Sequence, residues 1–265
     1  ITGDYSQTGG ALGIDAQHGG LLVSNGATIS GGLIVPILSS TGNYLHGSST
    51  LISAASLDLT GSNVSINAPV EVDASTHLDG SQLLLTIAND YVGGTLATLN
   101  NGDAINGAGF GLFIASTGSV ETIVNNGSYA GGYTGVVNRG SVGTLSNHGQ
   151  ITTTSFTALW NAGSIGQLTN TGTISGAVAV FNDGTIDSFA NSGVLAGTGD
   201  VFANHGSIGQ LVNTGTIANG TWAILNSGTI GTITNSGVIE GGATAIGSEG
   251  SIELVNNSGT MSGGS

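Results

Sequence analysis

Apolar and polar positions alternate along much of the chain, and from Gly118 onward the alternation carries a repeated motif. The motif is a seven-residue pattern, apolar-x-Asn-x-Gly-x-apolar, and it occurs twice in each repeat unit. One unit contains Leu159, Asn161, Gly163 and Ile165 in its first copy, and Leu168, Asn170, Gly172 and Ile174 in its second. Positions two residues apart lie on the same face of a strand, so each copy predicts a strand.

The spacing of the glycines defines the repeat unit. The first-copy glycines are Gly118, Gly140, Gly163, Gly184, Gly206, Gly228 and Gly250, and the second-copy glycines are Gly127, Gly149, Gly172, Gly193, Gly215, Gly237 and Gly259. Two glycines of one unit are nine residues apart, whereas units follow one another every 21 to 23 residues. The length of the unit therefore varies only in the connection that follows the second copy. Each unit is predicted to contain a strand, a tight bend at Gly166-Gln167, a second strand, and a longer connection with room for a third short strand.

A unit of this size cannot bury its own apolar face, but stacked units can. The sequence therefore predicts an all-β protein, a right-handed parallel β-helix (β-solenoid) with turns of about 22 residues. Residues 118–265 form its regular part, with two Asn-x-Gly strands per turn. Residues 1–117 have a composition similar to that of residues 118–265 but lack the regular spacing of the motif. We expect irregular N-terminal turns of the same β-helix there. In this segment Asn100-Asn101-Gly102 is a divergent copy of the motif.

Stacking predicts ladders of like residues inside the solenoid. One apolar ladder comprises Val142, Ile165, Ile186, Ile208, Ile230 and Ile252, and a second comprises Leu145, Leu168, Phe189, Leu211, Ile233 and Val255. The motif asparagines also have the inward phase, as in Asn161, Asn182, Asn204 and Asn226, and in Asn170, Asn191, Asn213 and Asn235. A buried amide is costly unless it is hydrogen-bonded, so we expect stacked side-chain amides to bond to one another. Their role is structural.

Composition excludes several functions. Charged residues are 6% of the chain, the formal net charge is -14, and Arg139 is the only strong base. Nucleic acid is excluded as a partner because phosphate binding needs clustered Lys and Arg. Cysteine is absent, which removes disulfides and thiolate metal sites. No metal or cofactor is expected. The densest acidic group is Glu71, Asp73 and Asp79, for which a weak cation site and a solvated face are the two alternatives.

The segments Asn161-Ala-Gly-Ser-Ile165, Asn170-Thr-Gly-Thr-Ile174 and Asn226-Ser-Gly-Thr-Ile230 resemble passenger domains of Gram-negative autotransporter adhesins, over residues 118–261. The resemblance implies secretion to the bacterial cell surface, outside the outer membrane. It also implies a signal peptide and a C-terminal membrane β-barrel outside these 265 residues. Expected partners are like molecules on neighbouring cells or a host surface protein or glycan. The family also includes passengers with protease or esterase domains.

Catalytic signatures are lacking, so we predict a non-catalytic rod for self-association or attachment. A serine-protease passenger needs a Gly-Asp-Ser-Gly motif, and Gly3-Asp4-Tyr5-Ser6 is no substitute. The enzyme alternative is a polysaccharide-acting β-helix, whose site needs clustered carboxylates with a basic partner. Rows of threonine also leave an ice-binding or glycan-binding solenoid open.

Two surfaces are candidates for binding. One is the column before each first-copy asparagine, which should face outward: Val137, Trp160, Phe181, Ala203, Leu225 and Gly247. If exposed, this apolar stripe marks a binding surface. The alternative is that a loop packs over it, and Trp222 is a candidate for that cover. The other is a flat hydroxylated face on the second-copy strand, with Thr169, Thr171, Thr173, Thr214, Thr216 and Thr234.

Overall fold

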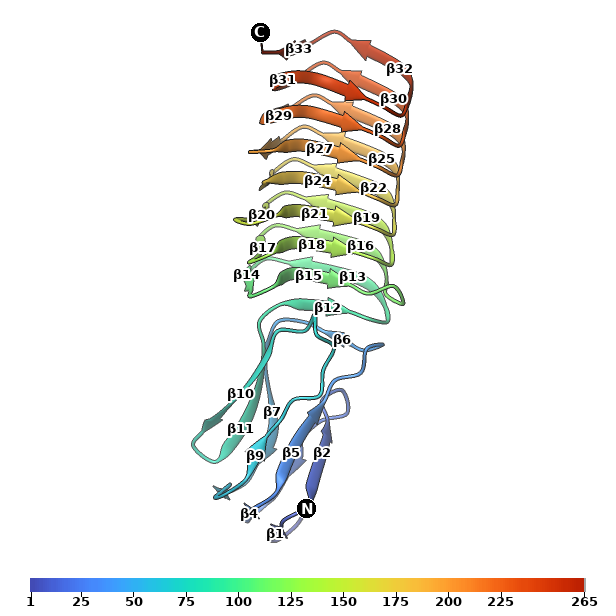
Figure 1. Ribbon diagram of the computed structural model, residues 1–265. Helices are drawn as coiled ribbons and strands as arrows, with labels where there is room; N and C mark the ends of the chain where they lie inside the picture. Colours follow the sequence, from blue (N-terminus) through green and yellow to red (C-terminus); the bar gives the residue numbers. More distant parts are fainter. Residues whose placement is uncertain (265) are drawn as a thin grey trace.

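The computed structural model describes residues 1–264, which form strands and turns and contain no helix. Parallel coils stack into a β-solenoid of about 12 turns with a spacing of about 22 residues. Figure 1 shows an elongated molecule with the two termini at opposite ends. The predicted all-β parallel β-helix is confirmed. Within residues 1–264 no helix is long and apolar enough to cross a membrane.

Each coil of the regular part contributes three strands to two sheets. In one coil these are β21 (Thr157–Asn161), β22 (Ser164–Asn170) and β23 (Thr173–Gly176). Strand β22 belongs to a sheet of eight strands, and β21 and β23 belong to a sheet of fifteen. The predicted third strand in the connection is therefore confirmed. In two later coils the third strand of one coil runs on into the first strand of the next, forming β29 and β31.

The strands of the eight-stranded sheet are β13 (Thr95–Asn101), β16 (Ser119–Asn125), β19 (Ser141–Asn147), β22, β25 (Thr185–Asn191), β28 (Ser207–Asn213), β30 (Thr229–Asn235) and β32 (Ser251–Asn257). Those of the fifteen-stranded sheet are β6 (Asn43–Tyr44), β12 (Asp90–Val92), β14 (Ala104–Gly107), β15 (Phe110–Ile114), β17 (Ser128–Gly131), β18 (Thr134–Asn138), β20 (Gln150–Thr153), β21, β23, β24 (Val178–Asn182), β26 (Val194–Gly197), β27 (Asp200–Asn204), β29 (Thr216–Asn226), β31 (Val238–Ser248) and β33 (Thr260–Gly263).

The bends of each coil lie at the Asn-x-Gly segments. The bend expected at Gly166-Gln167 was wrong, because β22 runs without interruption through both residues. Two successive outward residues at this point separate the buried Ile165 and Leu168, which explains why the inward positions are three apart. The chain turns instead at Asn161-Ala-Gly163 and Asn170-Thr-Gly172, between consecutive strands.

Two asparagine ladders run along the two bends, as predicted. Asn161 shows the arrangement, since its Nδ2 donates to Oδ1 of Asn182 in the next coil at 2.7 Å and to the Thr185 carbonyl at 3.1 Å. Its own carbonyl accepts the backbone N–H groups of Asp183 and Gly184, at 2.8 and 3.0 Å. Asn161 Oδ1 accepts a hydrogen bond from Asn138 Nδ2 at 2.8 Å, so both polar atoms of the buried side-chain amide have a partner, which removes the cost of burying it.

The glycine of each motif is required by close approach between coils. A Cβ atom at Gly206 would overlap the carbonyl oxygen of Gly184, the equivalent glycine one coil earlier. The motif glycines do not have positive φ angles, so left-handed backbone is not the reason for glycine here. Any other residue at this position would push neighbouring coils apart.

Both predicted apolar ladders are in register and buried between the two sheets. Ile165 pairs with Ile186, and Leu168 pairs with Phe189, which packs edge-on against Phe202 at 5.6 Å. The ladder residues become accessible to solvent only in the last coil, where Val255 is 42% exposed.

Residues 1–89, the N-terminal section, differ from the regular stack of residues 95–264. Two small parallel sheets contain β1 (Tyr5–Thr8), β4 (Gly26–Ser30) and β8 (Ser56–Asp58), and β2 (Ala11–Asp15), β5 (Leu33–Ile37) and β9 (Asn63–Val64). A third sheet contains β3 (Leu21–Leu22), β7 (Gly47–Ser53), β10 (Ala74–Asp79) and β11 (Gln82–Ile87). Its β10–β11 and β11–β7 pairs are antiparallel, which interrupts the parallel stacking expected of irregular turns, whereas the two small parallel sheets keep that stacking. In-register stacking already includes residues 95–117, and Asn101 begins one amide ladder.

Candidate functional site

The predicted threonine surface is divided among three places. Thr169 and Thr234 lie on strands of the eight-stranded sheet, where both are half-buried. Thr173 and Thr216 begin strands of the fifteen-stranded sheet, and Thr171 and Thr214 lie at the bends between the two sheets. These residues do not form one flat face, because the second-copy motif bends at its Asn-x-Gly segment. Their part in binding stays a prediction.

A continuous hydroxyl row does occur, one position after each first-copy glycine. Its members are Ser119, Ser141, Ser164, Thr185, Ser207, Thr229 and Ser251, which are paired in register at the start of successive strands of the eight-stranded sheet. All but Ser119 are exposed. Thr229 Oγ1 donates to Ser207 Oγ at 3.2 Å. We call this set the hydroxyl row.

Trp160 and Phe181 are neighbours in a longer column on the fifteen-stranded sheet. The register joins Tyr44, Tyr91, Phe113, Val137, Trp160, Phe181, Ala203, Leu225 and Gly247. We call this set the outer column. Its members differ in cover: Tyr91, Phe113, Val137 and Ala203 are at most 2% exposed, whereas Trp160 and Phe181, which lie between Val137 and Ala203, are only half-buried. The column is therefore not the fully exposed stripe that strict alternation predicts.

The N-terminal section covers Tyr91, Phe113 and Val137, which share one buried cluster with Ile34 and Leu38, and individual side chains contribute further cover. The Arg139 guanidinium lies 5.2 Å from the ring centroid of Phe113 and 5.6 Å from that of Trp160. His205 lies edge-on to Phe181 with the centroids 4.7 Å apart. The Trp222 ring lies against Gly247, as expected of a residue that covers the column. Such cation–π and edge contacts hold the rings in fixed orientations.

Asp183 links the half-buried part of the column to its polar border. Its Oδ2 accepts a hydrogen bond from Trp160 Nε1 at 3.0 Å, and its Oδ1 lies 3.4 Å from His205 Nδ1. The indole N–H is thereby satisfied, so the exposed part of Trp160 is mainly apolar ring.

A pocket of about 230 Å³ lies beside Arg139 at the buried end of the outer column. Its lining includes Ser40, Glu71, Tyr91, Phe113, Thr117 and Arg139. The Tyr91 hydroxyl donates to the Ser40 carbonyl at 2.8 Å, and Thr117 Oγ1 donates to the Gly93 carbonyl at 2.7 Å. Burial raises the pKa of Tyr91 above its ordinary value, and the Glu71 carboxylate raises it further. The pocket thus combines aromatic rings, hydroxyls, one acid and the only strong base of the chain.

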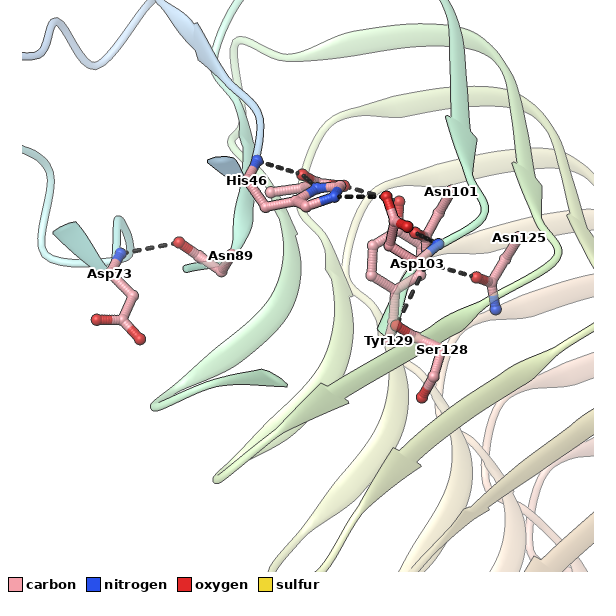
Figure 2. A network of polar contacts seen from close by, with 9 residues as sticks. His46, Asp73, Asn89, Asn101, Asp103, Asn125, Ser128 and Tyr129 are labelled. Carbon is pink, nitrogen blue, oxygen red and sulfur yellow. Dashed lines mark hydrogen bonds and ion pairs between the residues drawn. The ribbon is translucent and has the colours of Figure 1, made fainter. Parts of the chain in front are cut away.

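A polar network joins the N-terminal section to the regular stack (Figure 2). His46 Nδ1 lies 2.8 Å from Asp90 Oδ1, and His46 Nε2 lies 3.2 Å from Asp103 Oδ2. The backbone N–H of His46 also donates to Asp90 Oδ1 at 2.8 Å, and Tyr129 donates its hydroxyl to Asp90 Oδ2 at 2.9 Å. Asp90 is 1% exposed, so three hydrogen bonds replace its lost hydration.

The two carboxylates favour the charged form of His46. Burial by itself lowers the pKa of His46, but the hydrogen bonds to Asp90 and Asp103 outweigh it and raise the pKa above its ordinary value. Burial, with the Asp90 carboxylate, raises the pKa of Tyr129. Because both ring nitrogens of His46 face carboxylates, neither is available as a general base. The network therefore links the N-terminal section to the regular stack, and we call His46, Asp90, Asp103 and Tyr129 the His46 clasp.

The acidic group at Glu71, Asp73 and Asp79 is dispersed. Glu71 and Asp73 precede β10 instead of sharing a strand face, and Asp79 ends that strand at the hairpin. Asp73 Oδ2 accepts the backbone N–H of Ala108 at 2.7 Å, and its own N–H donates to Asn89, as Figure 2 shows. Within residues 1–264 no group of three His, Cys, Asp or Glu side chains is placed to hold a metal ion.

Sequence reasoning missed Tyr91, Phe113 and the His46 clasp. Phe113 could have been found by extending the outer column one unit upstream from Val137, although the motif asparagine is replaced there by Ile114. The clasp had no comparable signal, because His46 and Asp103 are 57 residues apart and share no motif.

Comparison of the chain with protein-family models, with curated proteins and with solved structures found no match. The structure defines the class of protein as a β-solenoid.

Proposed function

We propose that this chain is a non-catalytic adhesive rod, the passenger of a Gram-negative autotransporter adhesin, displayed on the outer surface of the bacterium. It mediates self-association with like molecules on neighbouring cells or attachment to a host surface protein or glycan. The observation that carries the proposal is the in-register stack of eight strands, which repeats equivalent outward side chains from coil to coil. Repetition at about 4.8 Å allows many weak contacts to add up to firm attachment.

Two surfaces support contact of this kind. The hydroxyl row offers uncharged donors and acceptors at a regular spacing. The half-buried rings of Trp160 and Phe181 offer apolar area of the type that is enriched at protein interfaces.

The non-catalytic part of the proposal is supported by the surroundings of the titratable groups. The His46 nitrogens face carboxylates, Asp73 is engaged by the backbone, and Asp183 is engaged by Trp160. Acid and base catalysis needs a group that is free to exchange a proton with a substrate.

The test is display of the chain on Gram-negative cells, with measurement of cell settling and attachment to host matrix. One variant changes Ser164, Thr185, Ser207 and Thr229 to Lys, which places four like charges on neighbouring strands. The matched control changes the same residues to Asn. We expect the Lys variant to lose clumping or attachment by at least about tenfold, since many weak contacts are lost together, and the Asn variant to keep most of it.

A second variant, Trp160→Ser with Phe181→Ser, tests the outer column. Full clumping and attachment in both variants, with circular dichroism and protease resistance unchanged, contradicts the proposal. Loss in one variant alone identifies the surface that makes the contact.

A further inference from the structure

Arg139 is held in an orientation that suits a carboxylate ligand. It is exposed, and the Phe113 and Trp160 rings lie 5.2 and 5.6 Å from its guanidinium. Within residues 1–264 the guanidinium forms no ion pair and no side-chain hydrogen bond. Arginine presents a planar fork of N–H donors that matches the two oxygens of a carboxylate, and a guanidinium held between rings loses little freedom on binding one.

The rest of the pocket suits a ligand that carries hydroxyl groups. Glu71 can only accept hydrogen bonds when ionised, and Thr117 Oγ1 already donates to Gly93, which leaves its lone pairs as acceptors. A ligand that donates hydroxyl protons therefore satisfies both. Tyr91 and Phe113 line the pocket but are each only 2% exposed, so its polar groups are the main contacts, and the volume of about 230 Å³ is below the range of drug-sized ligands. Such a space suits a single sugar unit.

We infer that this pocket binds a sugar unit that bears a carboxylate, at the end of a glycan, with Arg139 on the carboxylate and Glu71 and Thr117 on the hydroxyls. The inference rests on the proposed attachment function, whose ligand class it names. One acidic unit is favoured over a polyanion, because Arg139 is the only strong base of a chain with net charge -14. Further acidic units along the surface would be repelled.

The experiment compares two glycosides that differ only in the carboxylate. The purified chain is titrated with methyl β-D-glucuronide and with methyl β-D-glucoside, by calorimetry and by tryptophan fluorescence, since Trp160 lies against Arg139. We expect the glucuronide to bind with a Kd of about 1 mM and at least about tenfold more tightly than the glucoside. Acetate is the control for a carboxylate without a sugar ring, and we expect it to bind more weakly than the glucuronide.

Three variants assign the preference to Arg139. Arg139→Gln should abolish the preference for the glucuronide, and Arg139→Lys, which keeps the charge without the fork, should retain part of it. Asp187→Asn, on β25 of the other sheet, should leave both affinities unchanged. Circular dichroism and thermal melting establish that each variant is folded.

The inference is overturned by equal binding of the two glycosides, by no saturable binding of either, by acetate binding as tightly as the glucuronide, or by an unchanged preference in Arg139→Gln. Its failure is separable from failure of the proposed function. Cells that clump and attach although the purified chain does not prefer the glucuronide leave the adhesive rod in place without this site. A chain that prefers the glucuronide on cells that neither clump nor attach retains the site without the adhesive function.

Discussion

The regular stack and the N-terminal section are built from similar residues but are held together differently. In the stack, side-chain amides bond from coil to coil, and one ladder runs from Asn101 through Asn125 to Asn257. The N-terminal section has short strands, an antiparallel hairpin and a small separate core around Val23 and Ala27. Because the motif is repeated, each coil of the stack makes the same contacts as the previous coil. In a segment without the motif, each strand packs through a different set of contacts.

Glycine shows the same difference. The glycines with positive φ angles all lie in the N-terminal section, between Gly3 and Gly80. The motif glycines of the stack are needed because the backbone of the neighbouring coil leaves no room for a Cβ atom. Glycine is thus used for conformational freedom only in the N-terminal section, whereas close approach requires it throughout the stack and also at Gly20.

The largest effect is expected from a buried charge in the stack. Ile208→Asp places a carboxylate in the apolar ladder between Ile186 and Ile230. We expect a loss of more than about 4 kcal/mol in the free energy of unfolding, because an unpaired buried charge is among the costliest changes. Limited proteolysis with mass spectrometry should locate new cleavage sites in the adjacent coils.

The matched change in the other region is Ile29→Asp, since Ile29 is fully buried in the N-terminal section. Cleavage should then be confined to residues 1–89. Normal protease resistance of β25, β28 and β30 in Ile208→Asp would show that the inward register is wrong.

A smaller loss of stability is expected from alanine substitutions that compare the two reasons for glycine, close approach and left-handed backbone. Gly206→Ala should cost about 3 kcal/mol, because the methyl group meets the Gly184 carbonyl oxygen. Gly80→Ala should cost about 1 kcal/mol, because Gly80 has a φ of 58° in open space and only the left-handed conformation is penalised. Urea unfolding of both variants measures the difference.

Asparagine provides the control. Gly80→Asn should be nearly neutral because asparagine tolerates left-handed backbone, whereas Gly206→Asn should be as damaging as alanine. Rescue of Gly206 by Asn is the result that would contradict close approach as the cause.

The smallest effect concerns the His46 clasp between the two regions. The folded pKa of His46 is raised, so the stabilisation is fully present below its unfolded pKa of about 6.5 and is lost as the pH rises through the folded value. The groups that face it are Asp90 and Asp103, with Tyr129 on the far side of Asp90. Urea unfolding at about pH 6 should therefore show a more stable junction than at about pH 9.

His46→Gln is the control for the clasp, because it keeps hydrogen-bonding capacity but cannot titrate. The difference between the two pH values should shrink in this variant. An equal pH difference in His46→Gln and the unchanged chain would assign the effect to other groups.

Much of the regular stack could be predicted from the sequence because its information is local and repeated. The motif at Leu159, Asn161 and Ile165 contains the strand, the bend and the core position in seven residues, and the same letters return every 21 to 23 residues. The repeat therefore determined the fold class, both apolar ladders and the amide ladders. The location of the bend was misjudged because an inward spacing of three resembles a turn, although a strand with two outward residues produces it equally well.

Tertiary structure alone decided the rest, since it depends on contacts between segments without a common motif. The clasp brings His46 to Asp103, and the pocket brings Ser40 and Glu71 to Arg139. The exposure of Trp160 and Phe181 also depends on Arg139 and His205, which lie at the bends of neighbouring coils. Strand alternation determines which side of a sheet a residue takes. What covers that side is determined by packing of the neighbouring coils and of the N-terminal section.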